Sequence, residues 1–472
     1  MIAVFILGYS SIALEHSLKV NKAATALILC ALLWTIYVIN AEPILSASPA
    51  FIEHFNLGSI GDAIASLPDL HEKVIKYVTE VQIIEGLGDV ASTLFFLMGA
   101  MTIVELIDAH RGFSIITDKI TTRKKKELLW MLSFITFFMS AVLDNLTTTI
   151  VMVMLLRKIV ADKTERWRFA CLIVIAANAG GAFSPIGDVT TIMLWVKGNI
   201  TTAGVIPNLI IPSLLAMIIP LLVESLSMKG DVSTPKNSSN ASNNVDVITN
   251  RERKTIFFMG IGALVFVPIF KTITHLPPFI GVLFGLGVLW VYTEMLYHKK
   301  KQVPENAKAR ISVVLKKVDF TTILFFLGIL MAVNALQCAG ILRELAEFLD
   351  HTVGNPYLID IIIGVLSSIV DNVPLVAGCM GMYDITDAGL FATDGIFWMF
   401  LAYCAGVGGS ILIIGSAAGV VVMGLEKVDF GWYLKNISLL ALIGYLSGAG
   451  STSCKKRCFA HYSTYKVLSD TA

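Results

Sequence analysis

The stretch "AVLDNLTTTIV" (residues 141–151) places an aspartate, an asparagine and three threonines inside an apolar segment. A related stretch, "SIVDNVPLVAG", follows at residues 368–378. A carboxylate at the depth of the hydrocarbon costs at least ~2.5 kcal/mol, so a residue of this kind indicates a function by default. Each stretch therefore indicates both a break in an apolar helix and a candidate site.

The composition around these stretches is that of a polytopic membrane protein. Hydrophobic residues make up 56% of the 472 residues and charged residues 15%, and the mean hydropathy is +0.76. Soluble domains carry about 25% charged residues. The length leaves room for about ten membrane spans. A net charge of +1 gives no indication of a nucleic-acid partner.

Segment 128–160 is predicted to form a re-entrant hairpin. Its two arms, 128–143 and 146–156, are shorter than the ~20 residues that a membrane span needs. Both flanks, 111–126 and 157–168, are strongly basic and should therefore be cytoplasmic. A segment that starts and ends on one side places its tip, "DNLTT", deep in the membrane.

Segment 357–383 is predicted to be a second hairpin that enters from the opposite face. Its flanks, 343–356 and 384–394, contain a single basic residue, Arg343, and both are therefore predicted to be external.

Three pairs of motifs recur in the same order at nearly one offset, which indicates an internal duplication. The pairs are Asp144-Asn145 with Asp371-Asn372 (227 residues apart), "GGAFSPIGD" (180–188) with "GGSILIIGS" (408–416) (228 apart), and "FFLMG" (95–99) with "FFLGI" (325–329) (230 apart). An odd number of spans in each half turns the second half upside down, as the charged flanks independently indicate.

The predicted fold is therefore an all-α polytopic membrane protein with two inverted repeats. Each repeat would hold about five transmembrane helices plus one re-entrant hairpin with broken helices. We assign residues 1–227 to the first repeat, 228–254 to a polar cytoplasmic linker, 255–450 to the second repeat and 451–472 to a C-terminal tail. Inverted repeats with broken helices are the architecture of secondary transporters, whose substrate sites lie near the bilayer midplane.

The glycine-rich motifs predict where the helices break. "NAGGAFSPIGDVTT" (178–191) and "GVGGSILIIGSAAG" (406–419) place several glycines in the middle of apolar segments, and the first adds a proline. Carbonyl groups freed at this depth are tolerated where they line a cavity or bind a ligand. The alternative is that these glycines only permit close helix packing.

The hairpin tips and the broken helices supply a set of oxygen ligands. The candidate site for Na⁺ and H⁺ consists of Asp144, Asn145, Thr147, Thr148, Ser184, Asp188, Asp371, Asn372 and Ser416. Hard cations prefer oxygen ligands. A carboxylate that holds either a proton or Na⁺, but not both, makes an exchanger. The alternative is that each aspartate only caps a helix break or pairs with a buried base, although neither hairpin contains Lys or Arg.

Glu105 and Asp108 are a weaker candidate. They lie one helical turn apart near the predicted cytoplasmic end of a span. They mark either a proton entry or a solvated helix end.

These motifs resemble the NhaD-type sodium/proton antiporters of the ion transporter superfamily. The resemblance runs from about residue 5 to residue 450 and rests on "FFLMGAMTIVELIDAHRGF" (95–113), "DNLTTTIVM" (144–152), "GGAFSPIGDVTTIMLW" (180–195), "SSIVDNVPLVAGCMGMY" (367–383) and "GGSILIIGSAAGVVVMGLEKVDFGWYLKNISLLALIGYLSG" (408–448). It implies exchange of Na⁺, and usually Li⁺, for H⁺, an elevator-type motion and a homodimer in the lipid bilayer. No cofactor and no enzymatic activity are implied, because the ions are substrates.

Three other functions are less consistent with the sequence. Na⁺-coupled carboxylate symporters of the same superfamily carry neutral hairpin tips, whereas both tips here carry Asp. Intramembrane aspartyl proteases need a Gly-x-Gly-Asp, and here the stretch is "PIGD" (185–188). A channel does not need duplicated broken helices.

We expect a multi-pass protein of a bacterial cell membrane, with an organelle envelope as the alternative.

Overall fold

The structure is a computed structural model that describes residues 1–13, 18–45, 69–117, 120, 122–233, 248–300, 310–369 and 372–452. Within these ranges the regular structure is helical, and no strand is formed. Seven of the described helices are long and apolar enough to cross a membrane, and five more apolar helices have only 10–17 residues. The protein is therefore an all-α, multi-pass integral membrane protein, as the composition predicts. Four of the five short helices belong to the predicted second hairpin or to the segments predicted to be broken.

The chain divides into two compact units, and each unit combines segments from both halves of the sequence. The first consists of Met1–Met98, Asp319–Gly354 and Ala377–Asp384. Its helices are α1 (Ile2–Ala13), α3 (Lys22–Ile39), α4 (Ala41–Leu45), α7 (Leu70–Lys76), the π-helical turn η1 (Tyr77–Gln82), the first part of α8 (Ile83–Ala109), α18 (Phe320–Cys338), α19 (Ile341–Thr352) and the end of α21 (Asn372–Met382).

Helices α3 and α18 form the core of this first unit. The Trp34 indole donates to the carbonyl of Met331 at 3.0 Å. Gly328 lies so close to the backbone of Ala26 that a Cβ atom there would be only 2.7 Å from the Ala26 carbonyl carbon. The two helices are therefore packed backbone to backbone, which is the use of small residues expected between membrane helices.

The helix that carries "FFLMG" is longer than its apolar segment. The apolar residues cover about 87–108, whereas the structure is helical without interruption from Leu70 to Ala109. Asp69 caps the start by accepting a hydrogen bond from the His71 amide. Charged side chains such as Glu72 and Lys73 lower the hydropathy of the first turns without opposing helix formation.

The second unit consists of Gly99–Val318, Asn355–Val376 and Ile385–Ala472. Its helices, besides the end of α8, are α9 (Ser114–Thr117), α10 (Lys125–Leu143), α11 (Asn145–Ile159), α12 (Lys163–Ala182), α13 (Val189–Lys197), α14 (Thr202–Ser227), α15 (Asn250–Thr274), α16 (Pro278–Lys299), α17 (Ile311–Val314), α20 (Pro356–Leu366), the start of α21 (Asn372–Met382), α22 (Ile396–Gly408), α23 (Ala417–Glu426), α24 (Phe430–Asn436) and helical residues 438–452.

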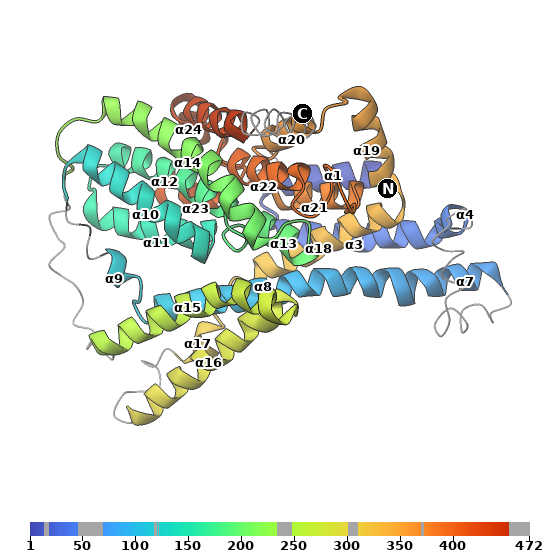
Figure 1. Cartoon of the computed structure of the whole chain (residues 1–472), viewed down its shortest axis with the longest axis horizontal. Helices are drawn as coiled ribbons and strands as arrows, with labels where there is room; N and C mark the ends of the chain where they lie inside the picture. Colours follow the sequence, from blue (N-terminus) through green and yellow to red (C-terminus); the bar gives the residue numbers. More distant parts are fainter. Residues whose placement is uncertain are drawn as a thin grey trace, which may run out of the picture. The chain divides into compact units, whose positions relative to one another are not determined.

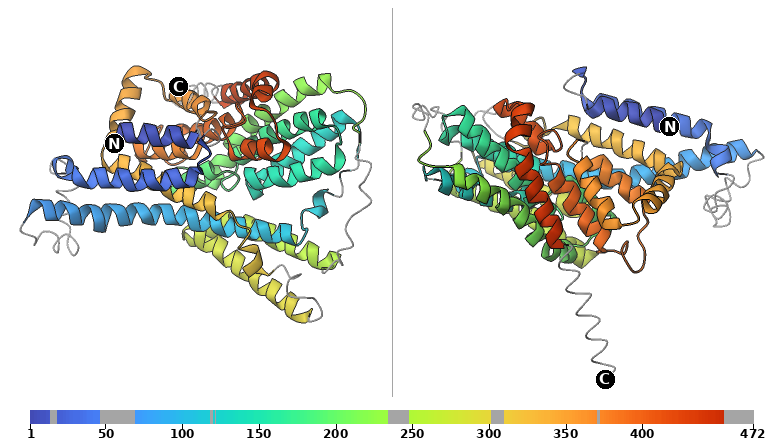
Figure 2. Two further views of the ribbon diagram at one scale, coloured as in Figure 1. Left: turned by 180° about the vertical axis from the view of Figure 1, so that it is seen from behind. Right: turned by 90° about the horizontal axis from the view of Figure 1, so that it is seen from above.

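Helix α12 is the centre of the second unit. Every residue from Phe169 to Ala182 is buried. The helix packs against α10, α11, α14, α22 and α23, and α10, α11 and α12 lie side by side in Figure 1. Helices α15 and α16 form a hairpin of their own (Figures 1 and 2).

Two helices meet at the predicted tip of the first hairpin, but the first of them is longer than expected, and the re-entrant course of the segment stays a prediction. Helix α10 has 19 residues and begins at Lys125, three residues before the apolar segment. At 1.5 Å per residue it is about 28 Å long, and its length and composition suffice for a membrane span. The apolar residues begin only at 128, but the stems of Lys125 and Lys126 can continue a helix into the membrane interface.

The contacts of the two halves repeat at the offset found in the motifs. The Ser140 hydroxyl donates to the carbonyl of Ala177 at 2.6 Å, and Ser367, 227 residues later, donates to the carbonyl of Ala405 at 2.8 Å. A Cβ atom on Gly180 would be 2.1 Å from the Phe137 carbonyl oxygen, and one on Gly408 would be 2.0 Å from that of Gly364. The helix pair α10–α12 is therefore packed like the pair α20–α22, which supports the duplication. The inverted orientation stays a prediction.

Candidate functional site

Asp144 is the single residue that connects α10 to α11. Its backbone has φ 84° and ψ 160°, a conformation found almost only in glycine. One carboxylate oxygen accepts from the Thr147 amide at 2.7 Å and the other from the Thr147 hydroxyl at 2.9 Å. The side chain therefore meets the positive N-terminal end of α11. It remains half-buried.

The two broken helices restart at Asp188 and Ser416, which are 228 residues apart. Asp188 caps α13 and accepts from the amide and the hydroxyl of Thr190 at 2.9 and 2.8 Å. Ser416 caps α23 and accepts from the Gly419 amide at 3.2 Å. Their backbone angles are nearly equal, at φ −145° and ψ 147° against φ −141° and ψ 153°. Asp188 and Ser416 thus do cap helices, as the alternative interpretation expects. Their side chains also contact other buried polar groups.

Asn145 and Asn178 connect the first hairpin to both broken helices. The Asn145 amide group donates to Asp188 at 2.5 Å and to the Asn178 oxygen at 3.1 Å. The Asn178 amide group then donates to the hydroxyls of Ser410 and Ser416, at 2.9 Å each. All five residues are at most 6% exposed. We call these five residues, together with Asp144, the polar cluster.

Asn178 and Ser410 are members that the sequence-based list lacks. Asn178 precedes the first glycine-rich break in "NAGGAFSPIGDVTT", and Ser410 follows the paired glycines in "GVGGSIL". A polar residue beside each glycine-rich break was therefore visible in the sequence. The sequence does not show that these residues belong to the site, because the partners of Asn178 lie 232 and 238 residues away along the chain.

The remaining predicted ligands have different surroundings. The hydroxyls of Thr148 and of its neighbour Thr149 are buried and have no hydrogen-bond partner among the described residues. The Ser184 hydroxyl donates to the Ala141 carbonyl at 2.5 Å and so secures the hairpin arm. Asn372 begins α21 and is 5% exposed. Asp371 lies outside the described residues, so its place in the site stays a prediction.

Glu105 and Asp108 are not joined to the polar cluster by any hydrogen bond or ion pair found among the described residues. Glu105 lies 3.6 Å from the Lys317 ammonium, and Asp108 is exposed. The next titratable residue, His110, is buried and forms a hydrogen bond with the Tyr297 hydroxyl at 2.9 Å. Burial lowers the pKa of His110. The role of Glu105 and Asp108 in proton entry stays a prediction.

The chemistry of the polar cluster suits a hard monovalent cation. Asp144 and Asp188 interact electrostatically as like charges, so a cation between them relieves their repulsion. The other ligands are amide and hydroxyl oxygens. Among the described residues, no three His, Cys, Asp or Glu side chains converge in the way a transition metal would need.

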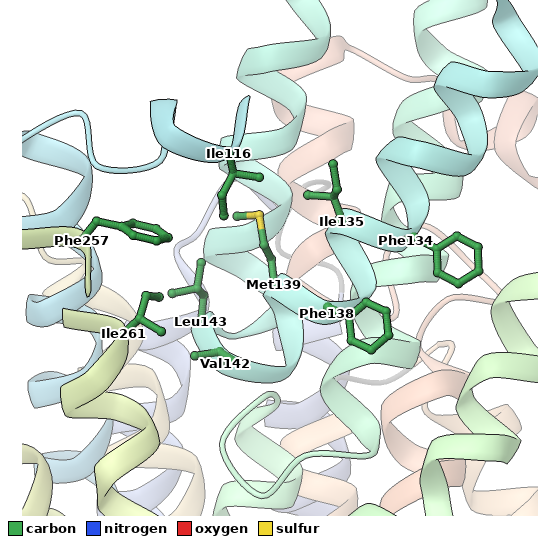
Figure 3. A pocket seen from close by; sticks show the side chains of 9 residues that line it. All are labelled: Ile116, Phe134, Ile135, Phe138, Met139, Val142, Leu143, Phe257 and Ile261. Atoms are coloured by element: carbon green, nitrogen blue, oxygen red, sulfur yellow. The ribbon is translucent and has the colours of Figure 1, made fainter. Parts of the chain in front are cut away.

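A pocket of about 400 Å³ lies on another face of the first hairpin arm. Its walls are apolar side chains of α10, of α15 and of Ile116 in α9, including Met139, Leu143 and Phe257 (Figure 3). An apolar lining offers a cation no ligands. The polar cluster, and not this pocket, is therefore the candidate ion site.

The chain is similar to known membrane transporters. The model of the CitMHS family, described as citrate transporter, matches residues 9–398. The chain belongs to this family. Sodium/proton antiporter 1 of Arabidopsis thaliana is 44% identical over 95% of this chain and 71% of its own length. Sodium/proton antiporter 2 of the same plant is 42% identical over 95% of this chain and 97% of its own length.

Bacterial members of the group are also similar to the chain. The Na⁺/H⁺ antiporter NhaD of Vibrio cholerae is 28% identical over 94% of this chain and 88% of its own length. The resemblance to NhaD-type sodium/proton antiporters is thus confirmed over most of the sequence. Within the CitMHS family the chain groups with these antiporters, and it is a membrane transporter.

Proposed function

We propose that this protein exchanges Na⁺, and also Li⁺, for H⁺ across its membrane. The observation that carries the proposal is Asp144, a half-buried carboxylate at a one-residue hairpin tip, directly beside the buried Asn145–Asp188 pair. The relatives named as sodium/proton antiporters support the same exchange.

The two described aspartates have different roles in this proposal. The Asp188 carboxylate accepts three hydrogen bonds, from Asn145 and twice from Thr190, so its negative charge is well compensated. Asp144 accepts from the amide and the hydroxyl of Thr147 and from the backbone of Leu146, but it remains half-buried where Asp188 is 1% exposed, so it is the more accessible of the two to a cation. Asp144 is therefore the carboxylate that exchanges Na⁺ for a proton, with Asp371 as its expected counterpart in the second tip.

The second candidate function is a Na⁺-coupled carboxylate symporter. The family description, citrate transporter, supports it. Two aspartates in one cluster oppose it, because their negative charges repel a carboxylate substrate at close range. Antiport is thus the function that the geometry supports better.

The motion we propose is of the elevator type. The two hairpins and broken helices would move together as the ion-carrying body of two inverted repeats, 1–227 and 255–450. The polar cluster supports movement as one body because its hydrogen bonds connect α11, α12 and the start of α23. A homodimer in the bilayer would hold the remaining helices still.

The membrane that holds the protein is also a proposal. The sequence leaves a bacterial cell membrane and an organelle envelope open. Relatives of 42–44% identity come from a plant and those of 28–30% from bacteria, which favours the organelle envelope. Microscopy of the tagged protein in a plant or algal cell tests this assignment.

The experiment for exchange is proton movement in proteoliposomes driven by a Na⁺ or Li⁺ gradient, with citrate uptake measured in parallel. We expect Na⁺-driven proton movement and no citrate uptake. Asp144→Asn and Asp371→Asn should each abolish exchange while the protein still inserts. Apparent Na⁺ affinity should fall about tenfold per unit fall in pH below the pKa of the exchanging carboxylate, if one proton is displaced per Na⁺. Citrate uptake without proton exchange would favour the symporter instead.

A further inference from the structure

Asp360 is a buried carboxylate that the polar cluster does not include. It lies in the second turn of α20 and is 0% exposed. Neither of its carboxylate oxygens has a hydrogen-bond partner among the described residues. An isolated carboxylate buried in this way pays a large desolvation penalty, so the group neutralises itself by holding a proton. In the conformation described, Asp360 is therefore an uncharged carboxylic acid.

Among the described residues, the groups found to interact electrostatically with Asp360 are titratable but not basic. Asp360 interacts electrostatically with Tyr357 on its own helix, with Cys404 of α22 and with Tyr445 of helix 438–452. The Tyr445 hydroxyl donates to the Ile361 carbonyl at 3.1 Å. None of these three neighbours carries a positive charge that could keep Asp360 ionised.

The packing of α20 against its neighbours is close on the face that carries Asp360. Gly364 follows one turn later on that face. A Cβ atom there would be 2.2 Å from the Tyr445 hydroxyl and 2.7 Å from the Cys404 carbonyl oxygen. Water has no room at Gly364, so the proton on Asp360 is occluded in this conformation.

The duplication shows that the fold does not require a carboxyl group at this position. The offset of 227 that relates Ser367 to Ser140 relates Asp360 to Ser133, and the offset of 228 that relates Ala405 to Ala177 relates Cys404 to Ala176. Ser133 is 1% exposed and Ala176 is fully buried. The first half thus builds the same helix pair with a small neutral residue, and a packing role does not account for the acid.

We propose that Asp360 is a second proton-binding site of the transporter, separate from the polar cluster, which carries one proton with the second hairpin. This proposal rests on the proposed Na⁺/H⁺ exchange. The proton is taken from water when α20 faces one side, is held on the carboxyl group while the site is occluded, and is released to water on the other side. A relay to the hairpin tip would need a hydrogen-bonded neighbour, which the described structure does not provide for Asp360.

The test compares Asp360→Asn and Asp360→Ser with the wild type. Asparagine mimics the protonated acid, and serine is the residue of the first half. The ratio of protons to Na⁺ is obtained from the reversal potential in proteoliposomes. We expect both variants to move one proton fewer per Na⁺, with unchanged Na⁺ affinity. Ser133→Ala, the matched change in α10, should keep the wild-type ratio.

Infrared difference spectroscopy provides a second test that does not depend on transport. A protonated carboxyl band that is present in the wild type, absent in Asp360→Asn and lost on raising the pH would support the site. An unchanged ratio in both variants, or a band that persists at all pH values, would overturn the proposal. A slower exchange at an unchanged ratio would also overturn it and indicate a relay. A wild type without any Na⁺-driven proton movement would instead refute the proposed exchange, because the infrared signal reads Asp360 by itself.

Discussion

At the scale of single residues, the backbone of Asp144 adopts a strained conformation. Its φ of 84° with ψ of 160° costs on the order of 1–3 kcal/mol for a residue with a side chain. The hydrogen bonds from Thr147 offset only part of that cost. Asp188, by contrast, caps its helix with an ordinary extended backbone at φ −145°. The hairpin tip thus uses a strained residue where glycine would be relaxed, which indicates that the carboxyl group is what the position requires.

This difference predicts opposite effects of one substitution at the two aspartates. Asp144→Gly should stabilise the protein by about 1 kcal/mol, because it relieves the strain and a glycine cap costs only a few tenths of a kcal/mol. Asp188→Gly should destabilise it, since there is no strain to relieve and its hydrogen bonds are lost. Both should abolish exchange. Thermal unfolding of the purified proteins in detergent gives the answer, and a lower melting temperature for Asp144→Gly would contradict the strain argument.

At the scale of elements, Glu426 ties the end of α23 to two helices of the first half. Its side chain is fully buried and accepts from Arg157 at 2.6 Å and from Arg166 at 2.5 Å. Arg157 lies in the last turn of α11 and Arg166 in the first turns of α12. The Trp167 indole also donates to the Glu426 carbonyl, at 2.9 Å. This contact joins α11, α12 and α23 at the ends opposite to those that the polar cluster joins.

Removing the charge of Glu426 should therefore lower the free energy of unfolding of the protein. Breaking a buried ion pair costs about 3–5 kcal/mol, and we expect about 2 kcal/mol for Glu426→Gln because both arginines are partly exposed. The control is Glu165→Gln, which breaks the partly exposed pair with Lys125 and should cost less than about 1 kcal/mol. Denaturation of both variants in detergent measures the difference. Equal losses would mean that Glu426 is not a buried anchor.

At the scale of the whole molecule, the central prediction is the inverted orientation of the two hairpins. The repeated contacts of Ser140 and Ser367 show that the two helix pairs are built alike. They do not say on which side of a membrane each pair begins, because the contacts within a helix pair are the same in either orientation. The charge of the flanking segments is the evidence for inversion.

Single cysteines test the inversion directly. After the native cysteines are replaced, Lys124→Cys and Lys163→Cys should react with an impermeant reagent only from the cytoplasmic side. Thr352→Cys and Ala388→Cys should react only from the external side. All four side chains are exposed in the structure, so a failure to react reflects the membrane barrier. Labelling of all four from one side would exclude two inverted repeats.

The sequence by itself determined the properties that depend on neighbours along the chain. Hydropathy established an all-α membrane protein, and the breaks at Asp144, Asp188 and Ser416 followed from cap-forming residues and nearby glycines. Helix ends were less certain, as the early starts at Lys125 and Leu70 show, because charged residues lower hydropathy but still form helices.

Only the tertiary structure decided which polar groups meet. Asn178 reaches Ser410 and Ser416 across more than 230 residues, and Asp360 is enclosed by Cys404 and Tyr445 without a hydrogen-bond partner in the described part of the chain. No local pattern distinguishes these residues from other polar residues in apolar segments. The physical reason is that a helix break depends on the backbone preferences of a few adjacent residues, whereas the convergence of side chains depends on how distant helices pack.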